Sequence, residues 1–118
     1  MTGLADEARR LSLASALTRH ARERVGDAAA DSDVEALLVA ARSLGAGATA
    51  FEQRHHVRFD PPYPGAVAGA KPDGARARVL FACTAYGPDG RAVGTVFTTL
   101  IAGRRPSVSV APPGARLH

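Results

Sequence analysis

Two adjacent histidines, His55 and His56, lie in the segment RHHVRFDPPYPG (residues 54–65). Imidazole titrates near neutral pH and serves proteins both as a general acid or base and as a metal ligand. Apolar and polar residues alternate over residues 51–60, which predicts a strand whose neighbouring side chains point to opposite faces. On this prediction the two histidines cannot bind one ion together, so we expect no metal site and no cofactor.

His55 is the residue of greatest chemical interest in this segment. In the predicted strand it shares an apolar face with Phe59, where a histidine needs a hydrogen-bond partner or a cavity. We therefore take His55 as the catalytic candidate and expect it to bind a ligand together with Phe59, Arg58 and Tyr86. The alternative is a histidine whose hydrogen bonds are satisfied within the core or at a sheet edge.

His56 would lie on the polar face of the same strand, between Arg54 and Arg58. This trio has the charge and the hydrogen-bond donors needed to bind a phosphate or a carboxylate group. The alternative for these three residues is a solvated strand face that binds nothing.

The single cysteine, Cys83, has no second cysteine with which to form a disulfide within the chain. It alternates with apolar residues on a predicted buried strand face, so we expect an unreactive core thiol. The chain also contains no GxSxG, P-loop, GxGxxG or HExxH motif. Nucleophilic catalysis therefore has little support, and the sequence leaves open whether the protein is an enzyme.

Charge is divided unevenly between the two halves of the chain. Residues 1–50 carry six arginines and seven acidic residues, a net charge of −1, whereas residues 51–118 carry nine lysines or arginines and four acidic residues, a net charge of +5. A basic half favours an acidic protein or a nucleic acid as partner. The alternative is that the arginines protect a sheet edge from strand addition. The arginines concerned are Arg54, Arg58, Arg76, Arg78, Arg104 and Arg105.

The periodicity of the apolar residues predicts a single α+β domain over residues 1–118. Residues 1–45 form its helical part, residues 50–110 its sheet part and residues 111–118 a loose tail. Two helices are expected to pack on one face of an antiparallel sheet of about four strands, a meander with a central hairpin. The expected helices are 4–25 and 33–44, and the expected strands are 51–60, 75–86, 91–103 and 107–110.

Local signals mark the ends of these elements. Ser32 and Glu35 have the spacing of a capping box at the start of the second helix. The sequence GPDG (residues 87–90) has the composition of a hairpin turn. Residues 45–50 and 61–74 are rich in glycine, alanine or proline, and we expect both segments to be loops.

The strands of the central hairpin are apolar on both faces. Phe97 and Ile101 alternate with Val96 and Leu100, although an antiparallel sheet with one exposed face normally alternates apolar with polar residues. We therefore expect a partner subunit or a bound apolar ligand to cover the second face, and we predict a homo-oligomer.

Two helices followed by a curved meander, with DSDVEALL (residues 31–38) opening the second helix, resemble the cone-shaped domains of the nuclear-transport-factor-2-like superfamily. The resemblance implies a pocket between helices and sheet, which polyketide cyclases and isomerases of that group line with histidine or aspartate. The chain departs from the pattern because residues 61–74 show no third helix and the strands are few. Hot-dog thioesterases are a weaker likeness, because no long central helix lies between strands.

No apolar run approaches the ~20 residues of a membrane-spanning helix. The first residues also lack the continuous apolar core of a signal peptide. We therefore expect a soluble cytoplasmic protein without a membrane partner. Because Lys71 is the only lysine among many arginines, the composition favours a bacterial source with a GC-rich genome.

The function expected from these observations is that of a small oligomeric α+β domain with a pocket for a small anionic or apolar ligand between its helices and its sheet. The alternative is a basic module that binds an acidic protein or, with less support, a nucleic acid through its arginine-rich sheet half. Nucleic acid has less support because Tyr86 is nearly alone as an aromatic residue suited to base stacking there.

Overall fold

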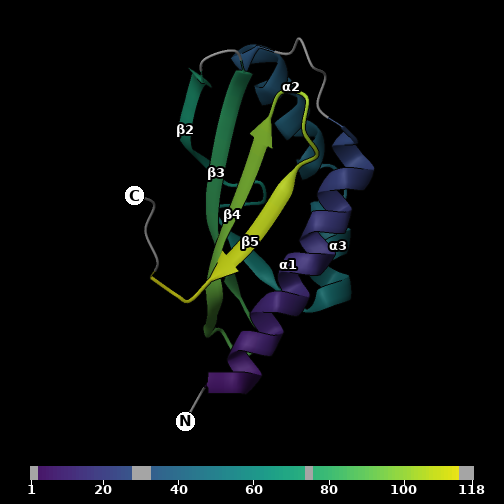
Figure 1. Cartoon of the computed structure of the whole chain (residues 1–118). Coiled ribbons are helices and arrows are strands. Elements are labelled where there is room, and N and C mark those ends of the chain that lie inside the picture. Colours follow the sequence, from purple (N-terminus) through teal and green to yellow (C-terminus); the bar gives the residue numbers. More distant parts are fainter. Residues whose placement is uncertain (1–2, 28–32, 74–75, 115–118) are drawn as a thin grey trace.

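The structure, a computed structural model, describes residues 3–27, 33–73 and 76–114. Within these residues three helices precede an open antiparallel sheet of five strands (Figure 1). The predicted α+β class is confirmed, with one helix and one strand more than expected. The helices are α1 (Gly3–Val25), α2 (Val34–Gly45) and α3 (Ala48–His55), and the strands are β1 (Arg58–Asp60), β2 (Ala66–Asp73), β3 (Arg76–Tyr86), β4 (Ala92–Ile101) and β5 (Ser107–Ala111).

The ends of α1 and α2 are set by local hydrogen bonds. Gly26 follows α1 with a φ of +69°, and its N–H donates to the carbonyl oxygen of Arg22 at 2.8 Å. The N-cap of α2 is Asp33, whose carboxylate accepts a hydrogen bond from the N–H of Ala36 at 2.8 Å. The capping role predicted for Ser32 is therefore filled by Asp33, and Ser32 itself lies outside the described residues.

Helix α3 corrects the prediction of one strand over residues 51–60. The chain is helical up to His55, turns at His56 with a φ of +54°, and becomes extended only in β1. The expected loop at residues 45–50 is likewise shorter, because Gly47 caps α3 with a φ of +80°. Phe51 and His55 caused the error, since a spacing of four residues suits both a helix face and a strand face.

Strand β3 is paired along both of its sides. On one side it pairs with β4, which in turn pairs with the short end strand β5. On the other side β1 pairs with the C-terminal end of β3, and β2 pairs with the remainder. The expected loop over residues 61–74 is therefore mostly strand β2, whose pairing with β3 outweighs the low strand propensity of its alanine, glycine and proline.

The segment PPYPG (residues 61–65) interrupts the row formed by β1 and β2. It turns Tyr63 into the core, where the side chain is 3% exposed. Gly65 closes the interruption with a φ of +94°, and a Cβ atom at this position would collide with the carbonyl oxygen of Ala82 on β3. Only glycine combines this backbone conformation with so close an approach of the two chains.

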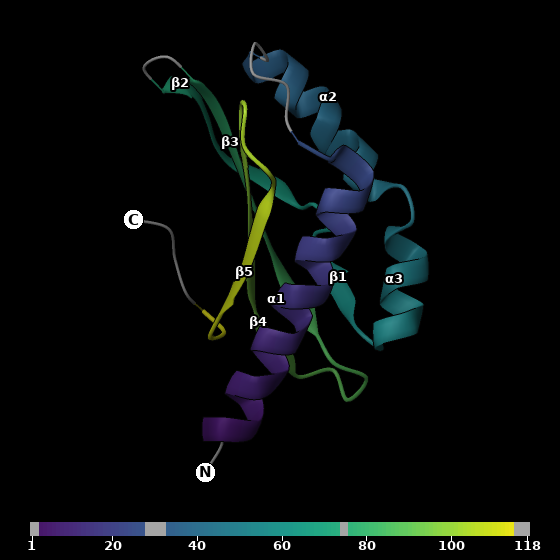
Figure 2. The same cartoon turned by 45° about the vertical axis from the view of Figure 1, so that its right-hand side comes forward.

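All three helices lie on one side of the sheet (Figure 2). Two clusters of buried side chains fill the space between them: one joins α1, α3 and the end of α2 to the sheet, and the other joins the rest of α2 to β3 and β4. Leu17 and Leu44 are at the centre of the first cluster, and Leu37 and Leu100 are at the centre of the second. The described residues place no helix against the opposite side of the sheet, which is called the outer face below.

No single helix in the described ranges is long and apolar enough to cross a membrane. Helices α2 and α3 meet that criterion only as a pair, and they are bent by 48° relative to each other.

Candidate functional site

His55 is the last residue of α3 and is exposed. Its ring stacks on Phe51, one helical turn earlier, with 4.2 Å between ring centroids and an interplanar angle of 32°. Partial burial lowers the pKa of His55, and the neighbouring charges of Arg54 and His56 lower it further. The expectation that His55 would share a strand face with Phe59 is wrong, because His55 belongs to a helix.

Arg58 and Tyr86 are the two predicted site residues that the structure brings together. They are register partners on β1 and β3, and the guanidinium carbon of Arg58 lies 4.7 Å from the centroid of the Tyr86 ring, a cation–π contact. Phe59 points to the opposite face of β1 and is buried against Tyr63, with ring centroids 5.5 Å apart. The four predicted ligand-binding residues thus occupy three separate places: the outer face, the core and the end of α3.

The core contains a set of polar side chains that no motif in the sequence indicates. Thr98 donates a hydrogen bond to the phenol oxygen of Tyr63 at 3.2 Å. The His20 ring lies against Phe51 and Tyr63, with its Nε2 atom 3.1 Å from the carbonyl oxygen of Leu44. A tyrosine inside a proline-rich segment was the one available signal, because buried phenols need a hydrogen-bond partner.

Burial determines the protonation of two of the core groups. It raises the pKa of Tyr63 to about 12, an effect partly offset by the hydrogen bond from Thr98. It also raises the pKa of Cys83 to about 12, and the charge of Glu52 acts in the same direction. Both groups are therefore neutral at pH 7, and the buried Cys83 lacks the thiolate that a nucleophile requires.

The arginines expected to form one basic surface are divided between the two ends of the sheet. Arg54 and Arg58 lie beside the end where β3 finishes, and the others lie beside the end where β3 begins. At that second end Arg76 donates to the carbonyl oxygen of Ala102 at 3.0 Å, and Arg105 pairs with Asp27 at 3.1 Å. Within the described ranges no three His, Cys, Asp or Glu side chains gather as metal ligands.

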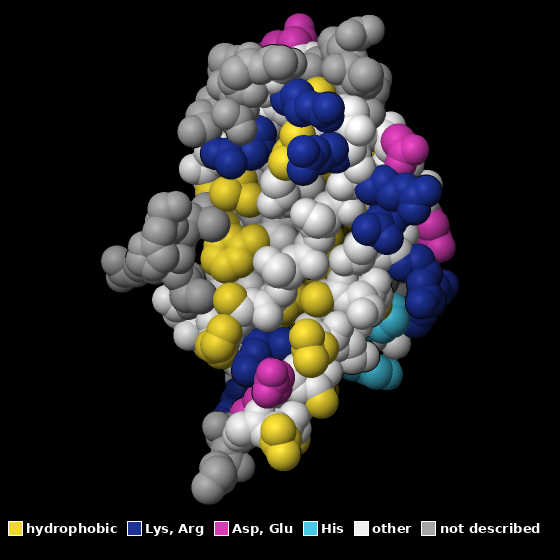
Figure 3. All heavy atoms as spheres, viewed as in Figure 1, with side chains coloured by type: hydrophobic (Ala, Val, Ile, Leu, Met, Phe, Trp, Pro, Cys, Tyr) yellow, Lys and Arg dark blue, Asp and Glu magenta, His cyan; other side chains and the backbone are white. Residues whose placement is uncertain are grey.

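The outer face carries an apolar strip along the middle of the sheet. The side chains of Leu80, Phe97 and Ile101 alternate with fully buried neighbours and are half-buried themselves. Phe97 stands between Ala82 and Ser109 in the register of three adjacent strands. Figure 3 shows hydrophobic side chains along the strands on this side, with Lys and Arg side chains gathered toward the upper end.

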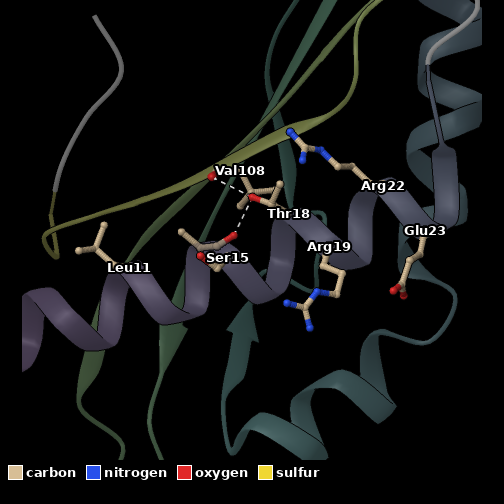
Figure 4. Close-up of a pocket in the computed structure, with 8 residues that line it drawn as sticks. Leu11, Ser15, Thr18, Arg19, Arg22, Glu23 and Val108 are labelled. Carbon is tan, nitrogen blue, oxygen red and sulfur yellow. Dashed lines mark hydrogen bonds between the residues drawn. The ribbon is translucent and has the colours of Figure 1, made fainter.

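An open groove of about 620 Å³ runs between α1 and β5 (Figure 4). The hydroxyl of Thr18 donates to the carbonyl oxygen of Ala14 at 2.7 Å and also lies 3.3 Å from the carbonyl oxygen of Val108 on β5. Arg22 points toward β5, whereas Arg19 and Glu23 point away from it. Because the Thr18 proton is shared between two carbonyl oxygens, this hydroxyl is a structural contact rather than a nucleophile.

No protein-family model, curated protein or solved structure matches this chain.

Proposed function

We propose that this chain is a self-associating module that pairs with a second copy through the outer face of its sheet. The observation that carries the proposal is the strip formed by Leu80, Phe97 and Ile101 on a face that none of the described helices covers. Packed against an equivalent face, these side chains would lose their remaining contact with water, which is the main driving force for association.

The dimensions of the sheet are sufficient for such a pair. Its strands have 3, 8, 11, 10 and 5 residues. Each residue covers about 3.3 Å along a strand and about 4.8 Å across it, so the face measures about 600 Å². Two faces would bury about 1,200 Å², the lower end of the range for specific, stable interfaces.

The arrangement of charge also supports pairing through the sheet rather than a basic surface for nucleic acid. The arginines stand at the two ends of the outer face and leave its centre apolar. Thr84 and Thr95 border the strip at one end, and Thr99 lies within it between Phe97 and Ile101. A mainly apolar centre with polar residues at its border is typical of protein interfaces.

Light scattering coupled to size exclusion tests the proposal. We expect the wild-type chain to have the mass of a dimer at micromolar concentration and Phe97→Lys to shift it to the mass of a monomer. Val39→Lys is the matched control, because Val39 is 58% exposed on α2, on the other side of the molecule. A monomeric wild type, or equal loss of mass in both variants, would contradict the proposal.

A further inference from the structure

Three arginines from separate parts of the chain converge on a pocket of about 280 Å³. Arg9 and Arg10 come from the beginning of α1, and Arg91 comes from the turn that joins β3 to β4. This pocket lies apart from the apolar strip of the outer face and is independent of the self-association proposed above.

Two glycines of the β3–β4 hairpin allow Arg9 and Arg10 to lie close to its backbone. A Cβ atom on Gly87 would lie 2.7 Å from Nη2 of Arg9 and 3.1 Å from its Nη1. A Cβ atom on Gly94 would lie 3.1 Å from Cδ of Arg10. The guanidinium of Arg9 therefore rests directly over the backbone of the turn, in space that any other residue at position 87 would occupy.

Among the residues that the structure describes, no ion pair neutralises the arginines of this pocket. Asp6 and Asp89 also line it, but the single ion pair within the described ranges is that between Arg105 and Asp27, elsewhere on the molecule. The carboxylate of Asp89 instead accepts a hydrogen bond within the turn, from the N–H of Arg91 at 3.0 Å. Three guanidinium groups against two carboxylates leave a net charge of +1.

From this geometry we infer that the pocket binds the phosphate group of a phosphate monoester. Such a group offers three acceptor oxygens and up to two negative charges, which match guanidinium donors arriving from different directions. The pocket volume equals the liquid volume of about nine water molecules. A phosphate group fills only part of that space, and the remainder accommodates the organic part of the ester.

The test is a titration with glycerol 3-phosphate followed by ¹H–¹⁵N NMR, with inorganic phosphate and sodium chloride of equal ionic strength in parallel. We expect both phosphates, and not chloride, to shift the amide signals of Gly87 and Gly94 saturably. Arg9→Gln should weaken the binding of glycerol 3-phosphate at least fivefold. Arg19→Gln, which removes an exposed arginine of α1 outside this pocket, should leave it unchanged.

Gly87→Ala is the decisive variant, because it changes no charge. The atoms nearest to its methyl group belong to the flexible end of Arg9 and to the carboxylate of Asp89, and the two backbone hydrogen bonds of Gly87 do not require glycine. We expect an unchanged thermal unfolding midpoint and at least fivefold weaker binding. The absence of saturable shifts, binding of inorganic phosphate alone, equal weakening by Arg19→Gln, or full affinity in a folded Gly87→Ala variant would each overturn the inference.

Discussion

The hydroxyl group of Thr98 on β4 donates a hydrogen bond to the phenol oxygen of Tyr63 across 3.2 Å, inside the core and 35 residues along the chain. Both side chains are almost completely withdrawn from solvent. This contact links the segment PPYPG, which lies between β1 and β2, to β4 on the other side of β3.

Removing either partner should destabilise the protein. Thr98→Val keeps the shape of the side chain but leaves the phenol of Tyr63 without its donor, and we expect a loss of about 1–3 kcal/mol in the free energy of unfolding. Tyr63→Phe should have an effect of similar size. The double variant should cost less than the sum of the two, as measured by urea denaturation. Strict additivity would show that the two groups do not interact.

Stability should fall in alkaline solution because two buried acids keep their protons in the folded state. The pKa of Tyr63 is raised from 10.0 to about 12, and that of Cys83 from 9.0 to about 12. Since the unfolded chain releases these protons first, the stabilising effect is complete below pH 9 and is lost as the pH rises toward 12. For Tyr63 the loss is about 3 kcal/mol.

The measurement is the free energy of unfolding between pH 7 and the alkaline limit of folding. Tyr63→Phe should make the curve less steep above about pH 10 and leave the loss due to Cys83 in place. Cys83→Ala should make the curve less steep from about pH 9 upward and leave the loss due to Tyr63 in place. If both variants lose stability with pH as steeply as the wild type does, the loss of stability in alkaline solution is due to other groups.

Gly65→Ala should be far more damaging than the same change at Gly26. Both glycines have positive φ, +94° and +69°, which costs an alanine about 1–2 kcal/mol. A Cβ atom at Gly26 meets nothing within 4 Å, whereas at Gly65 it collides with the backbone of Ala82. The difference between the thermal unfolding midpoints of the two variants measures the effect of this collision. Equal midpoints would show that β2 can move away from β3 without a loss of stability.

The elements predicted correctly from the sequence are those that local signals define. The β3 and β4 hairpin has alternating apolar residues around a turn sequence, and its observed burial alternates along both strands. Helix α1 has a long amphipathic pattern and a glycine stop. Strand β2 has neither signal, and its position depends on pairing with β3, a contact that its own residues do not specify. Its proline is tolerated because β2 lies at an edge of the sheet.

The candidate sites were harder to predict, because they depend on which segments meet. The interpretation of His55 required residues 51–55 to be extended, and it failed when they proved helical. The pocket of Arg9, Arg10 and Arg91 joins the first helix to a turn about 80 positions later in the chain. No spacing within the sequence relates Arg9 and Arg10 to Gly87 and Arg91. Only the packing of α1 against the sheet brings them together.

The interruption at residues 61–65 has a consequence for how copies of this chain could assemble. It breaks one border of the sheet, and at the other border Thr18 contacts the outermost strand. A foreign strand therefore meets an obstacle at either border, which is how natural sheets avoid growing into fibres. If two copies instead pack through their outer faces, each face is used once and no third copy can be added through it. The proposed pairing would thus give a finite assembly.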